Sequence, residues 1–339
     1  MKRTEYKPYD SGMVYVWSLL LPLVVSVVIS FCLYGSPTQT GTDGKEYYVI
    51  AKETWFLCFY RFLLAGLLVG LFFIYNKARK IDGFSACGIK QKSNYFNIAI
   101  CAVLGIGAVY LFSPFITLLT SLMANAGITI QKDIDLPLDN FGYYMLSLFL
   151  IGVLPAITEE LIYRGIIFNG LKKWGKWPAI LLSALAFSLM HGNFAQLPYT
   201  FILGIILGFI VWQTGALWLS MITHFFNNAT VITSMYINKQ NGVSETLPIS
   251  YSTSEILITI LMLLLAVGFV ILMFYLLTKT TKKAKMAENN TENYENLEKN
   301  TQNSANAIKK LQENTIMRDA LILGSGLVVA LIFVFIQSL

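Results

Sequence analysis

Long hydrophobic stretches separated by short polar loops dominate the pattern of this chain. An apolar stretch of about 17–25 residues is long enough for a helix to cross the hydrocarbon core of a membrane. Nine candidate stretches can be marked, and the fifth and sixth of them are short. They cover residues 13–34, 55–75, 95–123, 141–174, 178–191, 197–212, 216–237, 255–277 and 320–336. The pattern predicts an all-α fold, a polytopic transmembrane helical bundle of about eight or nine membrane helices.

The composition excludes an ordinary soluble globule. Charged residues make up 13% of the chain and the mean hydropathy is +0.60, whereas soluble domains carry about 25% charged residues. The net charge of +6 is interpreted as an excess of basic residues in the loops and not as a nucleic-acid-binding patch. The expected surroundings are the lipid bilayer, and no nucleic-acid partner is predicted.

Lysine and arginine in the loops predict the orientation, because cytoplasmic loops carry an excess of both. If the first helix runs outward, 15 basic residues fall on the side of the amino terminus and four on the other side. The N-terminus is therefore predicted to be cytoplasmic in a multi-pass protein of the cell membrane. The larger set is Lys2, Arg3, Lys7, Lys77, Arg79, Lys80, Lys90, Lys92, Lys172, Lys173, Lys176, Lys279, Lys282, Lys283 and Lys285, and the smaller set is Lys45, Lys52, Lys132 and Lys239.

The composition also divides the chain. Residues 1–278 are predicted to form the membrane domain, and residues 279–319 a charged, Asn-rich cytoplasmic linker without a stable core. Residues 320–339 are predicted to form a C-terminal transmembrane helix. The small residues of Gly324-Ser325-Gly326, like the Gly204/Gly208 pair, are interpreted as sites of close helix packing.

Two carboxylates, an arginine and both histidines of the chain lie deep inside apolar stretches. Each costs about 2.5–3.5 kcal/mol at bilayer depth on insertion scales, so such residues are usually paired or functional. Glu160 and Arg164 are four residues apart and can pair on one helix face. Glu159 points about 100° away and is not obliged to share that arginine. The other two are His191 and His224, the only histidines of the chain.

The depths of these polar residues agree. At about 1.5 Å per residue, Glu159 and His191 lie roughly 20 Å from the predicted cytoplasmic edge, and His224 and Asn228 roughly 13–20 Å. Phe187 precedes His191 by one turn on the same face. Each polar residue alone is readily explained as structural, since an amide or a histidine often joins membrane helices. Their common depth instead predicts one site.

The order of these motifs resembles that of a known family. Glu159-Glu160-x-x-x-Arg164, Phe187-x-x-x-His191 and His224-x-x-x-Asn228 are similar to the three motifs of the CPBP intramembrane proteases, also called the Abi family. That family comprises type II CAAX prenyl endopeptidases and relatives in bacteriocin processing or immunity. The resemblance covers residues 141–237.

The resemblance implies a membrane core with a cavity open to the cytoplasm. Glu159 and His191 would activate water, and His224 and Asn228 would stabilise the oxyanion or hold a metal. Glu160, Arg164 and Phe187 would support them. A zinc ion held by Glu159, His191 and His224 is an open alternative to a metal-free site, because histidine and carboxylate are normal zinc ligands.

The leading prediction is an intramembrane endopeptidase, a hydrolase that cleaves an apolar or membrane-associated peptide or a membrane protein. The main alternative is a non-catalytic member of the same family, either a bacteriocin-immunity protein or a membrane scaffold. A proton-coupled transporter is a third hypothesis, but it predicts internal repeats and the sequence has no convincing pair of halves. The Asn-, Lys- and Ile-rich composition suggests a Gram-positive bacterium of low GC content.

Overall fold

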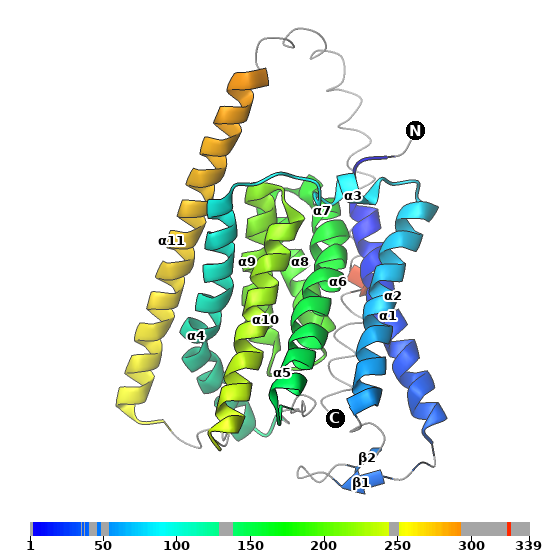
Figure 1. Ribbon diagram of the computed structural model, residues 1–339, viewed down its shortest axis with the longest axis vertical. Helices are drawn as coiled ribbons and strands as arrows, with labels where there is room; N and C mark the ends of the chain where they lie inside the picture. Colours follow the sequence, from blue (N-terminus) through cyan, green and yellow to red (C-terminus); the bar gives the residue numbers. More distant parts are fainter. Residues whose placement is uncertain are drawn as a thin grey trace.

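The computed structural model describes residues 3–34, 36, 38–40, 46–48, 54–128, 138–243, 251–292 and 324–326. Long helices run side by side through this part of the chain and form one bundle (Figure 1). They are α1 (Pro8–Cys32), α2 (Thr54–Ala78), α4 (Tyr95–Asn125), a composite helix over Phe141–Trp174, α8 (Lys176–Met190), α9 (Leu197–Thr214), α10 (Leu217–Gln240) and α11 (Thr253–Glu292). The predicted polytopic helical bundle is confirmed.

Six of the described helices are long and apolar enough to cross a membrane, namely α1, α2, α4, the composite helix, α9 and α11. The helix α8 is apolar but has only 15 residues. The helix α10 has 24 residues and carries histidine, asparagine and threonine along its length. These helices correspond to the first eight predicted stretches. The ninth lies outside the described residues except for residues 324–326, which are helical. The chain is thus a multi-pass membrane protein.

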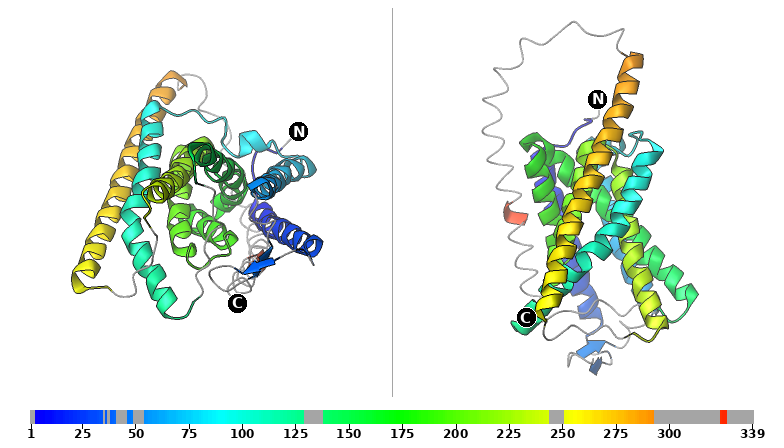
Figure 2. Two further views of the ribbon diagram at one scale, coloured as in Figure 1. Left: turned by 60° about the horizontal axis from the view of Figure 1, so that its bottom comes forward. Right: turned by 90° about the vertical axis from the view of Figure 1, so that its left-hand side faces the viewer.

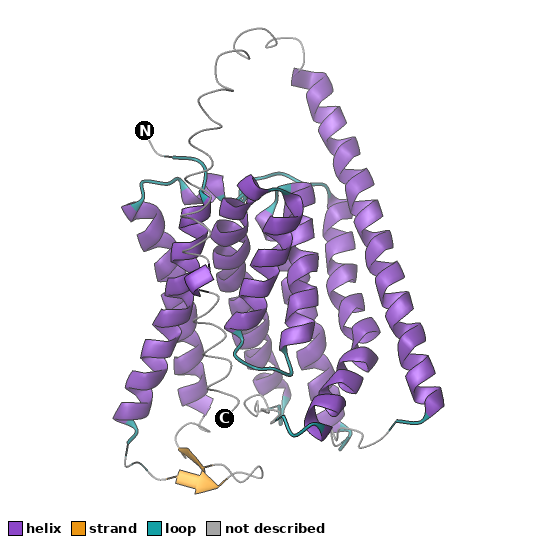
Figure 3. Ribbon diagram, turned by 180° about the vertical axis from the view of Figure 1, so that it is seen from behind, coloured by secondary structure: helices purple, strands orange, loops and turns teal. Residues whose placement is uncertain are grey.

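Two features differ from the sequence-based expectation. A short antiparallel hairpin of β1 (Thr38–Thr40) and β2 (Glu46–Tyr48) follows α1 (Figure 3). The helix α11 continues to Glu292, beyond the predicted start of the linker at residue 279. Part of the reason is a polar cluster that fixes this turn, in which Asn97 contacts Thr280 at 2.5 Å and Thr281 at 3.3 Å. Lys, Ala and Glu, which are good helix formers, also follow these threonines.

The composite helix and α8 occupy the centre of the bundle, between α1 and α2 on one side and α4 and α11 on the other (Figures 1 and 2). Every residue of the segment Leu161–Phe168 is buried. The helices α8 and α9 approach closely at Gly204, where an added Cβ would lie 2.8 Å from the Cβ of Ala184. A small residue at this point lets the two backbones meet, as the Gly204/Gly208 spacing predicts.

Contacts between loops define one end of the bundle. Arg3 exchanges backbone hydrogen bonds with Lys80 and Asp82, just before the short helix α3 (Gly83–Ala86). The indole of Trp218 donates to Gln91 O at 2.8 Å. These contacts place the N-terminal segment, the α2–α4 connection and the start of α10 together, at the end opposite the β hairpin (Figure 1).

The side of the membrane that each end faces is predicted from the basic loops. In a variant with Cys32 and Cys58 replaced by serine, a cysteine at Lys90 or Lys285 should be protected from an impermeant thiol reagent in intact cells. A cysteine at Lys45 or Lys239 should be labelled. Labelling Lys172→Cys and Lys239→Cys from the same side would contradict this topology.

The C-terminal tail is expected to be dispensable for the chemistry. Deleting residues 288–339 retains the α4–α11 cluster at Thr280 and every motif residue. It removes Gly326, whose added Cβ would lie 2.6 Å from the ring of Tyr15. We therefore expect a somewhat lower melting temperature but preserved membrane insertion and peptide cleavage. Loss of all cleavage in a well-inserted truncation would mean that the tail contributes to the site.

Candidate active site

The composite helix is irregular on both sides of its two adjacent glutamates. It consists of α5 (Phe141–Ser147), a π-helical segment η2 (Leu148–Val153), α6 (Leu154–Glu160), a second π-helical segment η3 (Leu161–Phe168), α7 (Asn169–Leu171) and a final 3₁₀ turn η4 (Lys172–Trp174). Pro155 at the start of α6 explains part of this, because proline has no N–H to donate to the carbonyl four residues earlier. π-helical turns are rare and are frequently found at functional sites.

Glu160 and Arg164 form a fully buried ion pair. Glu160 Oε1 lies 2.7 Å from Arg164 Nη1, and both side chains have no solvent exposure. Arg164 Nη2 also lies 3.4 Å from the carbonyl oxygen of Gly204 on α9. This pairing follows the four-residue spacing and leaves Glu159 without a share in the arginine.

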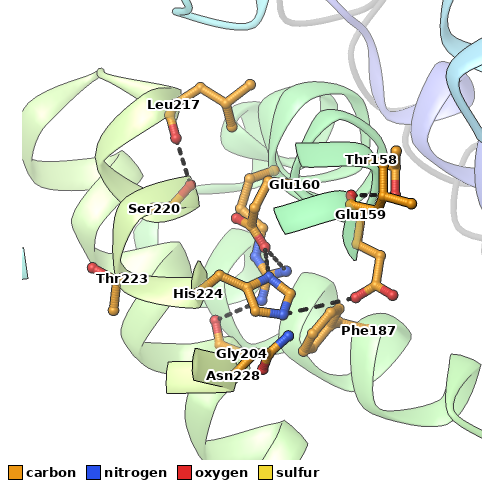
Figure 4. Close-up of polar contacts among 12 residues, drawn as sticks. Thr158, Glu159, Glu160, Phe187, Gly204, Leu217, Ser220, Thr223, His224 and Asn228 are labelled. Atoms are coloured by element: carbon orange, nitrogen blue, oxygen red, sulfur yellow. Dashed lines mark hydrogen bonds and ion pairs between the residues drawn. The ribbon is translucent and has the colours of Figure 1, made fainter. Parts of the chain in front are cut away.

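His224 lies between the two adjacent carboxylates (Figure 4). Its Nδ1 is 3.2 Å from Glu160 Oε1, and its Nε2 is 3.9 Å from Glu159 Oε2. Because Glu160 is a carboxylate paired with Arg164, it accepts and His224 Nδ1–H donates. The other ring nitrogen then faces Glu159, whose side chain is 16% exposed and is the most accessible of these groups.

The ring of Phe187 on α8 connects the polar groups of three helices. The guanidinium carbon of Arg164 lies 4.2 Å from the ring centroid. The imidazole rings of His191 and His224 approach edge-on, with centroids 4.9 Å and 5.6 Å away. A cation over an aromatic face contributes up to about 2 kcal/mol or more when it is desolvated. Phe187 therefore packs against every cationic or imidazole group of the cluster.

The structure places His191 and Asn228 at the edge of this cluster. His191 Nδ1 is 2.9 Å from the carbonyl oxygen of Phe187, one turn back in its own helix. As a carbonyl can only accept, this ring donates from Nδ1, and in the neutral imidazole its Nε2 is then the acceptor. Asn228 lies one turn after His224 and donates from Nδ2 to Ile151 O at 2.9 Å. Both side chains are half-buried.

Comparison with known families agrees with the three motifs. Residues 141–230 match the family model described as Type II CAAX prenyl endopeptidase Rce1-like. These residues form a CPBP-family domain. The match supports a CAAX-type intramembrane protease and contains every motif residue from Glu159 to Asn228. Comparisons with curated proteins and with solved structures gave no match.

The described His, Cys, Asp and Glu side chains of the CPBP domain are not gathered into a metal site. Within the described residues, no three His, Cys, Asp or Glu side chains are grouped so that they could hold a metal ion. Of the three ligands considered from the sequence, His224 and His191 each use Nδ1, toward Glu160 and Phe187 O, so only their Nε2 atoms could face an ion. No step through a metal is therefore derived for this domain.

Ser18 on α1 lies outside the matched segment, and its contribution to the site was not predicted. The hydroxyl of Tyr163 lies 3.3 Å from Ser18 Oγ on α1, and its ring packs edge-on against Phe187 with centroids 5.5 Å apart. The helix α1 thus supports the CPBP domain through Tyr163. Ser18 is one of several serines in membrane helices, so its spacing alone carries no signal of this contact.

Proposed function

We propose that the protein is an intramembrane endopeptidase in which Glu159 activates the attacking water. Glu160 is occupied by Arg164 and His224, whereas Glu159 is partly exposed and has no arginine partner among the ion pairs of the described residues. The observation that carries the proposal is the gap of 3.9 Å between Glu159 Oε2 and His224 Nε2. A water hydrogen-bonded to both atoms fits this gap when its two bonds are bent.

The charges of the four groups support this division of roles. Two carboxylates are balanced by Arg164 and by His224 if its ring carries two protons. A buried cluster with zero net charge avoids an uncompensated charge, which is strongly unfavourable in an apolar interior. In that state His224 donates from Nδ1 to Glu160 and offers Nε2–H to an oxyanion, while Glu159 remains a free base.

The hydrolysis can be followed atom by atom. Glu159 Oε2 takes one proton from the water. At the same time the water oxygen bonds to the carbonyl carbon of the peptide. The carbonyl oxygen becomes an oxyanion, and His224 Nε2–H donates to it. The C–N bond then breaks, and Glu159 returns the proton to the leaving nitrogen. The acceptor nitrogen of His191 is proposed to hold the same water, as its sequence motif implies.

The substrate is proposed to be an apolar or membrane-associated peptide, or a segment of a membrane protein. The site lies among buried apolar residues of the bundle, which suits a substrate that reaches it from the membrane. The test is to compare peptides from membranes that contain either the wild type or Glu159→Gln. New peptide termini should appear only with the wild type. Identical peptide sets would favour the alternative, a non-catalytic immunity or scaffold protein.

Metal removal should not abolish the reaction. Cleavage by the purified protein should persist at close to its full rate after dialysis against a zinc chelator, because no step depends on a metal. The measurement is the initial rate of peptide cleavage together with the zinc content of the same preparation. If the rate falls to background and returns with one equivalent of zinc, then His191, His224 and Glu159 must act as ligands.

A further inference from the structure

We infer that Asn228 is a positioning residue that satisfies a carbonyl left without its helical donor by Pro155. Ile151 lies in the π-helical segment η2, where Leu154 N–H donates to Phe149 O, five residues back. Where α6 resumes the four-residue spacing, the donor for the carbonyl of Ile151 would be the N–H of residue 155. Residue 155 is proline, which has no N–H. Asn228 Nδ2 lies 2.9 Å from Ile151 O and supplies a donor from the neighbouring helix α10. This inference rests on the proposed function, since the positioned groups are those of the proposed reaction.

The bond between Asn228 and Ile151 is partly buried. A carbonyl left without a partner costs about 1–3 kcal/mol when it is fully buried, so this bond helps to hold the two helices in one register. The helices also approach closely here, because an added Cβ on Gly152 would lie 3.5 Å from the ring of Phe225. Asn228 follows His224 by one turn, and Ile151 precedes Glu159 by about two turns. The bond therefore helps to set the separation of His224 and Glu159.

The second π-helical segment provides a parallel. There the side chain of Asn169 donates to the carbonyls of Arg164 and Gly165 at 2.8 Å and 3.0 Å. The hydroxyl of Ser11 donates to Ile167 O at 2.7 Å. Backbone carbonyls in and around both irregular segments thus receive side-chain donors, and Asn228 performs this task for the first of them.

The experiment combines substitutions at positions 228 and 155 in the full chain. Asn228→Ala should lower the melting temperature and reduce kcat on the order of ten- to a hundredfold, because misplacing reacting groups by about 1 Å can cost about a hundredfold. KM should change little. Asn228→Asp, which keeps the shape but cannot donate when ionised, should behave in the same way. Pro155→Ala restores an N–H at residue 155. The double variant Asn228→Ala/Pro155→Ala should therefore recover much of the kcat and most of the melting temperature that Asn228→Ala loses.

Asn227→Ala is the matched control. Asn227 is the adjacent residue of α10, and its amide donates to the hydroxyl of Tyr199 on α9 at 2.8 Å. Its loss should lower the melting temperature by the same amount in the wild type and in the Pro155→Ala variant. If Asn228→Ala also lowers the melting temperature equally in the wild type and in the Pro155→Ala variant, the positioning role is overturned. This measurement does not depend on activity.

The kinetic outcomes separate two failures. If Pro155→Ala is active but the double variant is as inactive as Asn228→Ala, the amide acts on the reacting atoms and the inference is overturned while the proposed protease stands. Full activity of Asn228→Ala also overturns it. If the wild type shows no cleavage of membrane peptides, the proposed function fails, and the melting temperatures alone decide whether Asn228 replaces the donor missing at Pro155.

Discussion

Replacing Glu160 by glutamine should lower the free energy of unfolding by about 3–5 kcal/mol, the typical loss when one partner of a buried ion pair is removed. Glu160 Oε1 is the only ion-pair contact of Arg164 among the described residues, at 2.7 Å, and both side chains are fully buried. The variant leaves a guanidinium in the interior whose direct contacts are all neutral, namely the new amide, the Gly204 carbonyl and the Phe187 ring. Thermal melting of the detergent-solubilised protein measures the loss.

The control is a second substitution at the partner. Arg164→Gln removes the orphaned charge, so the double variant Glu160→Gln/Arg164→Gln should melt at a higher temperature than Glu160→Gln alone. Cleavage should fall in both variants, because His224 Nδ1 loses the carboxylate that lies 3.2 Å away and holds its ring. A stable Glu160→Gln protein that has lost cleavage would mean that Glu160 takes part in the chemistry and that the roles of the two glutamates are reversed.

The placement of helices and of the carboxylate pair could be predicted because both depend on local spacing. Long apolar stretches specify membrane helices, and residues four apart on one helix lie on the same face. The spacing therefore brings Glu160 within reach of Arg164 without help from any other helix. The continuation of α11 past residue 279 could not be predicted in this way, because the contacts of Thr280 and Thr281 with Asn97 join helices that are distant in sequence.

The partners of His224 depend on how three helices are rotated against one another, and no spacing within one helix fixes that rotation. The two π-helical segments change the local rotation from its α-helical value, and Pro155 was the one visible signal of the first of them. The spacing along the chain predicted the position of Phe187 beside His191. The contacts of Phe187 with Arg164 and His224 arise where α8 meets the composite helix and α10, which a pattern along one chain segment does not contain.

Replacing Glu159 by glutamine should abolish cleavage while leaving the protein folded. A general base of this kind contributes typically 10²- to 10⁴-fold to a rate, and an amide of the same shape cannot take the proton of the water. Glu159 has no arginine partner in the described ion pairs and is 16% exposed. When its charge is removed, His224 can give up its second proton, so the variant keeps no unbalanced buried cation. The melting temperature should therefore stay within a few degrees of the wild type. Both quantities should be measured on one preparation, by thermal melting and by the rate of release of a labelled membrane peptide.

Glu160→Gln, assayed beside it, provides the contrast that separates chemistry from folding. The two glutamates are adjacent on one helix and lie at nearly the same depth, so a general effect of removing a carboxylate would appear in both variants. A selective loss of rate at Glu159 and a selective loss of stability at Glu160 require the division of roles proposed above. If Glu159→Gln instead cleaves at the wild-type rate, water is activated elsewhere, and His191, whose Nε2 in the neutral imidazole is left as an acceptor by the bond from Nδ1 to Phe187 O, becomes the group to replace next.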